Sequence, residues 1–435
     1  MQIAFVVGQG VAFLFFGACL LYLLRLLVHA AILRGKAPAL FPPSVSDFSS
    51  TLSLREGQEI RAAQGETRKR FAILIPAHDE ALTLNAALDG IKKLDYPSDA
   101  FRVVVIADNC TDETAQIAVN AGVLVLERTN QEEIGKGYAL EWAMGQLFKG
   151  AANSPVREIA DFDALVILDA DTIVARDLLL CFEQGLNLGE EALQARYEVL
   201  NVDESWRTRL MACALSLAHI VKPLGREHLS LSDGLKGNGM CFARSVVERV
   251  PWSGASITED IEYTLRLCRA EVRIVFLPQT AVWAQMPTTG KQAVSQRKRW
   301  EGGRYQLLFH VAPRTFQEGI ARKNRLLTDR AIELIIPPFA ELVAVPVLFL
   351  VIALICGKVF GWQSAELFSI GWMLLLVLEA VYLFGGLWVS RTPARVMVSL
   401  LAAPFYILWK LSLYPVMLIS RKTSGEWKRT ERREM

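Results

Sequence analysis

Acidic residues stand directly after several short apolar runs of the chain. Asp108 closes one such run, and Asp169 and Asp171 close the run 164–171. Two carboxylates separated by one residue can face a divalent ion that bridges two phosphates, and hard oxygen ligands suit Mg²⁺ or Mn²⁺. Asp108 could accept hydrogen bonds from a ribose or a nucleobase, although Asp108 and Asp112 could equally be turn and capping residues.

A second pair of acids, Glu259 and Asp260, opens the predicted helix 261–270. The helix dipole favours acids in a first helical turn, which gives their position a purely structural explanation. The chemical alternative makes Asp260 a general base that takes a proton from an acceptor hydroxyl, with Glu259 beside it in the catalytic pair.

The segment 296–300, Gln-Arg-Lys-Arg-Trp, combines guanidinium groups with an aromatic ring. A guanidinium can hold a diphosphate through two parallel hydrogen bonds, and a tryptophan face can stack on a sugar ring. The alternative is a basic stretch anchored by Trp300 at a lipid interface.

Composition and spacing exclude several other classes of site. The seven cysteines contain no CxxC pair, so neither a zinc site nor a disulfide framework is indicated. A formal net charge of +2 gives no argument for nucleic-acid binding. The glycine loops 135–137 and 237–239, which contain Lys136 and Asn238, predict close backbone approaches and do not fit a Walker loop.

The elements that position these residues read as strands that alternate with helices. Short, β-branched apolar runs suit strands buried on both faces of a mainly parallel sheet. Their alternation with helical periodicity predicts an α/β, doubly wound sheet with its ligand at the carboxyl ends of the strands. The predicted strands are 71–76, 102–108, 123–127, 164–171 and 273–278, and the predicted helices are 81–93, 111–120, 137–148 and 205–221.

Apolar runs predict membrane helices at both ends of the chain. The run 3–24 is about long enough to cross a bilayer, and the basic residues after it place the following domain in the cytoplasm. The runs 332–356 and 365–389 predict two further spans.

A third C-terminal run, 396–419, contains Pro404, Lys410 and Pro415. Either it is a re-entrant or interfacial element, or it spans the membrane and the basic tail beyond it is translocated. The positive-inside rule favours the first alternative, and both stay open.

These boundaries divide the chain into six parts. They are an N-terminal anchor 1–36, a linker 37–70, a catalytic domain 71–300, an interfacial segment 301–331, a C-terminal membrane region 332–420 and a basic tail 421–435.

Taken in order, four motifs resemble the D, DxD, TED and QxxRW series of membrane-bound family-2 glycosyltransferases, such as cellulose, hyaluronan, chitin and poly-N-acetylglucosamine synthases. The motifs are Asp108, Asp169-x-Asp171, Thr258-Glu259-Asp260 and Gln296-x-x-Arg299-Trp300. The resemblance implies a GT-A fold, a nucleotide-sugar donor, usually a UDP-sugar, and Mg²⁺ or Mn²⁺ as cofactor.

The resemblance also implies a role for each matching residue. The donor would contact Pro76, Glu80, Asp108, Lys136 and Asp169, and Asp171 would ligate the metal. Asp260 would be the base, and Gln296, Arg299 and Trp300 would bind the diphosphate and the acceptor end. Asp79 stands where the family usually has Asn, which leaves its contact with the base in doubt.

The expected function is inverting transfer of a sugar to a growing exopolysaccharide at the cytoplasmic face of the plasma membrane. One alternative is a single transfer to a lipid or polyprenyl-linked acceptor. An alternative of another class is a catalytically silent, nucleotide-binding membrane scaffold. The motifs leave the sugar, the linkage and the need for a partner membrane protein undetermined.

Overall fold

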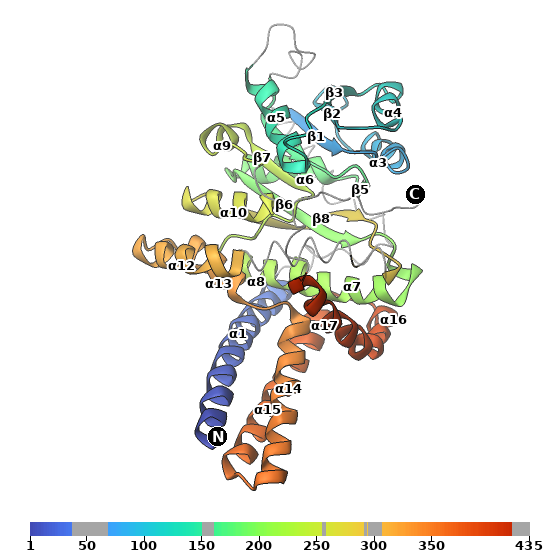
Figure 1. The fold of residues 1–435 in the computed structure, drawn as a ribbon. Coiled ribbons are helices and arrows are strands. Elements are labelled where there is room, and N and C mark those ends of the chain that lie inside the picture. Colours follow the sequence, from blue (N-terminus) through green and yellow to red (C-terminus); the bar gives the residue numbers. More distant parts are fainter. Residues whose placement is uncertain (37–67, 150–160, 255–257, 291–293, 295–306, 420–435) are drawn as a thin grey trace.

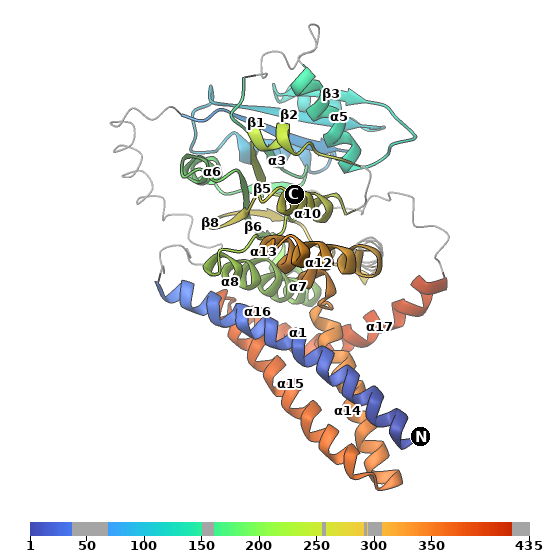
Figure 2. The ribbon, with the colours of Figure 1, turned by 90° about the vertical axis from the view of Figure 1, so that its left-hand side faces the viewer.

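The computed structural model describes residues 1–36, 68–149, 161–254, 258–290, 294 and 307–419. Most of the predicted linker 37–70 and all of the basic tail 421–435 lie outside these ranges. An α/β domain stands at one end of a long bundle formed by the N-terminal helix and the C-terminal helices (Figures 1 and 2).

The α/β domain is built on one eight-stranded sheet with the order β3-β2-β1-β4-β7-β6-β8-β5. Neighbours among the first four strands run parallel, whereas β7 is antiparallel to both β4 and β6. The pair β6–β8 is parallel, and β5 is antiparallel to β8. The strands are β1 Phe71–Ala77, β2 Phe101–Asp108, β3 Leu124–Arg128, β4 Ala164–Ile167, β5 Thr172–Val174, β6 Ala192–Val199, β7 Met240–Ala243 and β8 Ile274–Ala284.

The predicted strands are present, but the sheet is more mixed than their sequences indicate. The predicted strand 164–171 breaks after Ile167, so that Asp169 lies in a loop between β4 and β5. Three strands, β5, β6 and β7, were not predicted, and β5 has only three residues. β7 has only four residues, and β6 carries Gln194, Arg196 and Glu198 on a pattern too polar for the apolar runs used to find strands.

Helices cover both faces of the sheet. On one face, Leu84 and Leu88 of α3 pack with Phe182 of α6; on the other, Leu140 of α5 packs with Tyr263 of α10. Both layers exclude water from the apolar strands, which is the main stabilising contribution of such a sheet. The helices of this domain are α3 Leu84–Ile91, α4 Thr114–Asn120, α5 Lys136–Lys149, α6 Leu178–Asn187, α7 Trp206–Ser216, α8 Lys222–His228, α9 Arg244–Arg249 and α10 Glu259–Arg269, with the π-helical turn η4 Leu217–Val221 joining α7 to α8.

Beyond the sheet, the chain forms short helices and then long apolar ones. These are α12 Ala312–Ala321, α13 Arg325–Ile335, α14 Phe339–Phe360, α15 Gln363–Val389, α16 Ala394–Met397, the 3₁₀ turn η6 Val398–Ala402 and α17 Ala403–Ile419, together with the N-terminal α1 Gln2–Lys36. The predicted span 332–356 begins too early, because Pro337 and Pro338 end α13 and α14 starts after them.

Four segments of the described chain are long and apolar enough to cross a membrane: 2–36, 339–360, 363–389 and 394–412. The first three pack lengthwise, and a polar clamp joins them. Trp372 Nε1 donates to Gln9 Oε1 at 2.5 Å, and Gln9 Nε2 donates to the carbonyl of Phe349 at 3.3 Å. By contrast, α17 crosses the direction of these helices near the α/β domain (Figures 1 and 2).

The α/β domain is fixed to the bundle where α1 meets α8. The helices come so close that a Cβ on Gly225 would lie 2.3 Å from the carbonyl oxygen of Leu26. Beside this contact, the buried Arg226 donates to Asp329 at 2.8 Å, to Glu333 at 2.6 Å and to the hydroxyl of Tyr22 at 2.9 Å. One guanidinium therefore links α1, α8 and α13.

Charge balance holds this junction together. Burial by itself would raise the pKa of Glu333, but Lys222 and Arg226 hold that pKa well below its usual value. Tyr22 donates its hydroxyl proton to Asp329 at 2.7 Å. A buried ion pair contributes little net stability, but the loss of one partner leaves the other charge without compensation.

Substitution Arg226→Ala should therefore destabilise the protein by about 3–5 kcal/mol, because Asp329 and Glu333 lose the buried cation that they share and keep only their separate contacts with Arg330 and Lys222. The matched control is Arg249→Ala, which removes an exposed pair with Glu191 and should cost about 0–1 kcal/mol. Thermal unfolding in detergent measures both changes. Equal unfolding temperatures for the two variants would contradict the anchoring role of Arg226.

Candidate active site

Three neighbouring parallel strands end at the same edge of the sheet and lead into acidic residues. β1 is followed by Glu80, β2 ends with Asp108, and β4 is followed by Asp169. The first turn of α10 brings Glu259 and Asp260, and α5 begins with Lys136. The sheet edge and two helix starts thus build the candidate site together.

Lys136 is the centre of this cluster. Its ammonium contacts Asp169 Oδ1 and the carbonyl oxygen of Gly237. Burial by itself would lower the pKa of Lys136, but the carboxylates of Asp169, Glu259 and Asp260 raise it above its usual value. Lys136 is therefore a charged lysine that holds the acids of two segments, the β4–β5 loop and the start of α10, in one place.

Glycine allows the start of α5 to approach the loop before α10. A Cβ on Gly137 would lie 2.9 Å from the carbonyl oxygen of Gly254 and 3.3 Å from Cβ of Glu259. Trp252 donates its indole N–H to the Gly137 carbonyl at 3.2 Å, which fixes this contact. The predicted close approach at 135–137 is therefore present, and it positions Lys136 beside the acids of α10.

The two acids of α10 are half-buried and lie in the negative field of the cluster. Burial, then the neighbouring Asp260, raises the pKa of Glu259 to about 7, and Lys136 opposes this rise. Burial also raises the pKa of Asp260. A carboxyl with a raised pKa is a stronger proton acceptor when ionised, which is the property of a general base.

The loop between β4 and β5 carries the two acids of the predicted metal motif. The side chain of Asp169 is 29% exposed, whereas Asp171 is buried. Carboxylate oxygens from two residues of one loop form a donor set that fits Mg²⁺ or Mn²⁺. Asp171, to which the sequence analysis assigns the metal, and Asp169, which it assigns to the donor, would together be able to hold such an ion.

Asp108 is less exposed than its predicted role in donor binding implies. Its Oδ1 accepts hydrogen bonds from Arg128 at 2.7 Å and from the Asn109 side chain at 3.2 Å. Arg128 ends β3 and stands opposite Asp108 in the parallel register. The sequence analysis did not single out Arg128, although Arg128 is the last residue of β3 just as Asp108 is the last residue of β2.

The loop after β1 is tied to the loop after β2. Asp79, with a φ of 54°, accepts from the backbone N–H of Thr111 at 2.6 Å. Asp79, Cys110 and Asp112 have ligand atoms within 4.8 Å of one another. Burial raises the pKa of the Cys110 thiol to about 11, and Asp79 is engaged by backbone N–H groups, so this group stabilises a turn rather than offering a metal site.

The other predicted donor contacts lie at the same edge. Pro76 belongs to β1, and Glu80 is buried, with an oxygen that accepts from the Thr83 hydroxyl at 2.8 Å. Gln296, Arg299 and Trp300 lie outside the described residues. Two further polar residues support this edge: Asn238 accepts the backbone N–H of Asp169, and Gln194 donates to the carbonyl of Asn238. In the sequence, only the glycines around Asn238 pointed to it.

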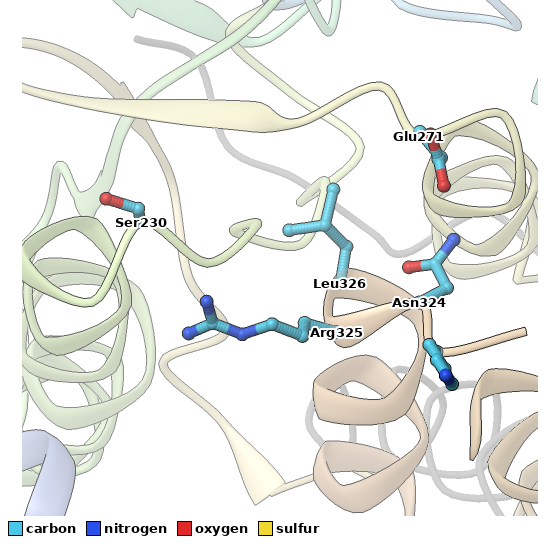
Figure 3. Close-up of a pocket in the computed structure, with 6 residues that line it drawn as sticks. Ser230, Glu271, Asn324, Arg325 and Leu326 are labelled. Carbon is cyan, nitrogen blue, oxygen red and sulfur yellow. The ribbon is translucent and has the colours of Figure 1, made fainter.

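A separate pocket of about 260 Å³ lies between the ends of α8 and α10 and the α12–α13 turn (Figure 3). Glu271, which lines it, follows the last turn of α10, whereas Glu259 and Asp260 open the first. A helix of this length separates its two ends by about 16 Å, so this pocket is not part of the acidic cluster.

Comparison with known proteins places this arrangement among described families. The family model with the description "Glycosyltransferase like family 2" matches residues 68–303. A beta-monoglucosyldiacylglycerol synthase from Nostoc sp. is 28% identical over 246 residues, which cover 54% of this chain and 49% of that protein. A poly-beta-1,6-N-acetyl-D-glucosamine synthase from Staphylococcus epidermidis is 24% identical over 248 residues, 55% of each chain.

Among solved structures, the mannosyltransferase PcManGT from Pyrobaculum calidifontis, in complex with GDP-Man and Mn²⁺, is similar with a TM-score of 0.49 and 18% identity. That alignment covers 88% of this chain and 98% of the mannosyltransferase. The chain spans about half to three fifths of the length of the curated relatives that it matches.

The raised pKa of Glu259 predicts a pH-dependent effect on stability. Because the folded protein holds the proton up to about pH 7 and an unfolded Glu releases it near 4.3, stability from this group is full at low pH and is lost as pH rises through 7. Glu259→Gln should therefore unfold near the wild-type temperature at pH 5 and at a higher temperature at pH 8.

Thermal unfolding at the two pH values measures this difference directly. The control Glu248→Gln changes an exposed carboxyl on α9 and should give the same difference from wild type at both pH values. A pH-independent difference for Glu259→Gln would show that Glu259 has no raised pKa.

Proposed function

This chain belongs to the family described as Glycosyltransferase like family 2, and from that premise we propose that it transfers a sugar from a nucleotide donor, a UDP-sugar in the simplest case, to a growing exopolysaccharide at the membrane. The observation that carries this proposal is the convergence of Asp169, Glu259 and Asp260 on Lys136. The acids come from separate motifs of the chain and meet at one edge of the sheet.

The family match confirms three expectations drawn from the sequence. The resemblance to family-2 glycosyltransferases is correct, the chain is a glycosyltransferase, and its α/β domain has a GT-A-like fold. Membership of the family also argues against the silent-scaffold alternative.

The proposed reaction is a direct displacement. Asp260 takes the proton of an acceptor hydroxyl, whose oxygen forms a bond to the anomeric carbon of the donor sugar. The bond from that carbon to the diphosphate oxygen breaks, and the nucleoside diphosphate leaves with the electron pair. Attack opposite the leaving group inverts the configuration.

The residues of this chain supply the proton acceptor and the electrostatic setting. The partial burial of Asp260 raises its pKa and so strengthens it as a base, and the ammonium of Lys136 offsets the negative charge of the Asp260 carboxylate. A Mg²⁺ or Mn²⁺ ion held by Asp169 and Asp171 would offset charge on the leaving diphosphate. Gln296, Arg299 and Trp300 are proposed, from the motif, to bind the diphosphate and the acceptor end.

A lipid acceptor is the second candidate. One matched relative is named as a synthase of a glucosylated diacylglycerol and another as a polysaccharide synthase, so both acceptor classes occur among proteins similar to this one. The small number of helices that pack lengthwise in the bundle supports the lipid alternative, since a polymer requires a path across the membrane.

We also propose that α1, α14 and α15 span the plasma membrane while α16 and α17 lie on its cytoplasmic surface. Lys410, near the middle of α17, pairs with Glu341 in the first turn of α14 at 2.6 Å. If α14 begins at the cytoplasmic face, this ion pair places the middle of α17 at that face and not in the bilayer centre.

Two further features support this placement. Val396 of α16 packs against Cys213 of α7 in the α/β domain. An apolar row on the opposite side, Leu401, Phe405 and Leu408, is at least 66% exposed, as expected of an interfacial helix that faces lipid. The basic tail 421–435 would then be cytoplasmic, in agreement with the positive-inside rule.

Substitution Asp260→Asn should lower the turnover of a nucleotide-sugar by about 10²–10⁴-fold while donor binding persists, because the amide cannot accept the acceptor proton. Nucleotide release by the full-length protein in lipid, with Mn²⁺ and a panel of UDP- and GDP-sugars, measures the rate. The control Asp89→Asn, on the exposed surface of α3, should leave the rate unchanged. Near-normal turnover in Asp260→Asn would reject its role as the base.

Sizing the products of the same reaction distinguishes the two acceptor classes. A ladder or polymer supports the exopolysaccharide reaction, whereas one labelled lipid supports the second candidate. No turnover with any donor, in the presence of both acceptor classes, would contradict the proposed function.

The proposed topology predicts a cytoplasmic C-terminus. A fluorescent protein fused after Met435 should fluoresce in a bacterial host, and alkaline phosphatase fused at the same place should be inactive. Phosphatase fused after Gly361, in the turn between α14 and α15, should be active and serves as the control. Phosphatase activity at the C-terminus would instead favour a membrane-spanning α17.

A further inference from the structure

The loop Gly237-Asn238-Gly239 lies against the loop that carries Asp169 and Asp171. The proposed reaction gives the side chain of Asn238 no role. Asn238 is completely buried. Its side-chain oxygen accepts the backbone N–H of Asp169 at 3.1 Å, and its side-chain nitrogen donates to the Thr172 hydroxyl at 2.8 Å. One amide therefore holds the residues on both sides of Asp171.

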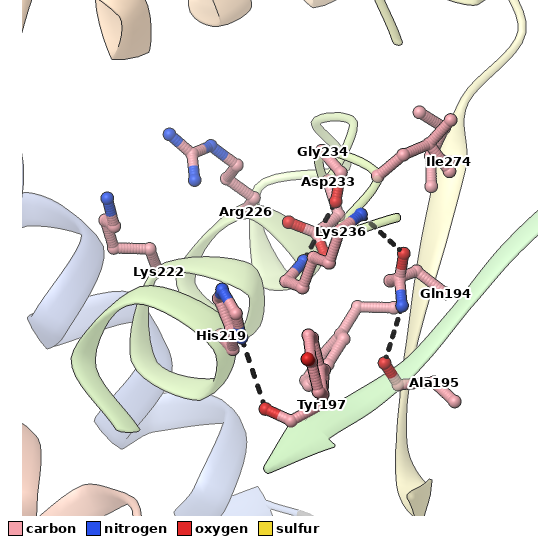
Figure 4. A network of polar contacts seen from close by, with 12 residues as sticks. Gln194, Ala195, Tyr197, His219, Lys222, Arg226, Asp233, Gly234, Lys236 and Ile274 are labelled. Carbon is pink, nitrogen blue, oxygen red and sulfur yellow. Dashed lines mark hydrogen bonds and ion pairs between the residues drawn. The ribbon is translucent and has the colours of Figure 1, made fainter. Parts of the chain in front are cut away.

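A second buried amide holds this loop from below. Gln194 of β6 is fully buried, and its Nε2 donates to the carbonyl of Asn238 at 2.8 Å and to that of Ala195 at 2.9 Å. Its Oε1 accepts the backbone N–H of Lys236 at 3.0 Å. Figure 4 shows the side chain of Gln194, which lies on the same strand as Ala195, hydrogen-bonded to Lys236 and to Ala195.

The glycines on either side give the loop its shape. Gly237 and Gly239 have φ values of 75° and 66°, which residues with a Cβ rarely adopt. A Cβ on Gly239 would also lie 2.7 Å from the side chain of Val282. The carbonyl of Gly237 meets the ammonium of Lys136, so the same loop contacts both Lys136 and the metal motif.

We propose that Asn238 is a positioning residue that sets the conformation of the Asp169–Asp171 loop for metal and donor binding, with Gln194 supporting it. This inference rests on the proposed function, since it assigns the divalent ion to Asp169 and Asp171. Two carboxylates separated by one residue repel each other, and the backbone that carries them must be restrained for both to face one ion. Hydrogen bonds of this kind orient metal ligands and tune their affinity.

An amide meets the requirements of this position better than the other side chains of its size. The site needs one acceptor for the N–H of Asp169 and one donor for the hydroxyl of Thr172. An aspartate would add a buried negative charge beside two carboxylates, whereas an apolar residue would leave the buried N–H of Asp169 without its partner.

The test measures Mn²⁺ binding to the full-length protein in detergent with UDP present, from the electron paramagnetic resonance signal of free Mn²⁺. Loss of a hydrogen-bonding partner behind metal ligands typically weakens metal affinity about 10–100-fold. Asn238→Ala should show a loss of this size, and Thr172→Val should show part of it. Thr172→Ser, which keeps the hydroxyl, should bind Mn²⁺ nearly as the wild type does.

The matched control is Asn324→Ala. Asn324 is also a buried amide: its side-chain nitrogen donates to the Cys268 carbonyl, and its side-chain oxygen accepts the Leu327 N–H. It caps α13 beside the C-terminal end of α10, whereas Glu259 and Asp260 lie at the other end of that helix. It should lower the unfolding temperature without changing Mn²⁺ affinity. If Asn238→Ala does not fold, the pair Thr172→Val and Thr172→Ser gives the same comparison.

Wild-type Mn²⁺ affinity in Asn238→Ala, or in Thr172→Val where the first variant does not fold, would overturn the inference. An equal loss in Asn324→Ala would do the same, because it would assign the effect to general destabilisation. Since Mn²⁺ binding with UDP does not require turnover, a protein that binds both but transfers no sugar would contradict the proposed function and leave this inference standing.

Discussion

The candidate active site depends on one cation that offsets the charge of a group of half-buried acids. Asp169, Glu259 and Asp260 come from two distant segments, and each would be costly to bury in its ionised form. The Lys136 ammonium contacts Asp169 directly and offsets the charge of the other two. The position of Lys136 at the start of α5 thus determines where the β4–β5 loop and the start of α10 can meet.

A similar arrangement fixes this site relative to the membrane bundle. Arg226 joins α1, α8 and α13 through buried acids and the Tyr22 hydroxyl. Between this junction and the active site lies the loop that contains Lys236, itself paired with Asp233. The acidic cluster of the candidate active site is therefore held at a defined place relative to the bundle, which suits the proposed enzyme with an acceptor that emerges from, or remains in, a membrane.

Much of the fold could be predicted because the relevant signals are local. The apolar run of β1 predicts a buried strand from its own composition, and the acids after β2 and β4 follow from the rule that parallel sheets bind ligands at their carboxyl ends. The missed strands have two causes, and for β5 and β7 the cause is their length of three and four residues. β6 is a strand because it pairs with β7 and β8. Its polar residues Gln194, Arg196 and Glu198 interrupt the apolar pattern by which a buried strand is recognised in a sequence.

The sequence by itself determined the family, the main strands, the apolar helices and the acids that serve as candidate catalytic and metal-binding groups, because each depends on residue type and short spacing. Only the tertiary structure decided how these groups are paired. Asp108 meets Arg128, and Asn238 meets Asp169 and Thr172, across 20 to 69 positions of the chain. Such contacts depend on strand order and on loops shaped by glycine, and no local pattern of residues encodes the partner at the other end.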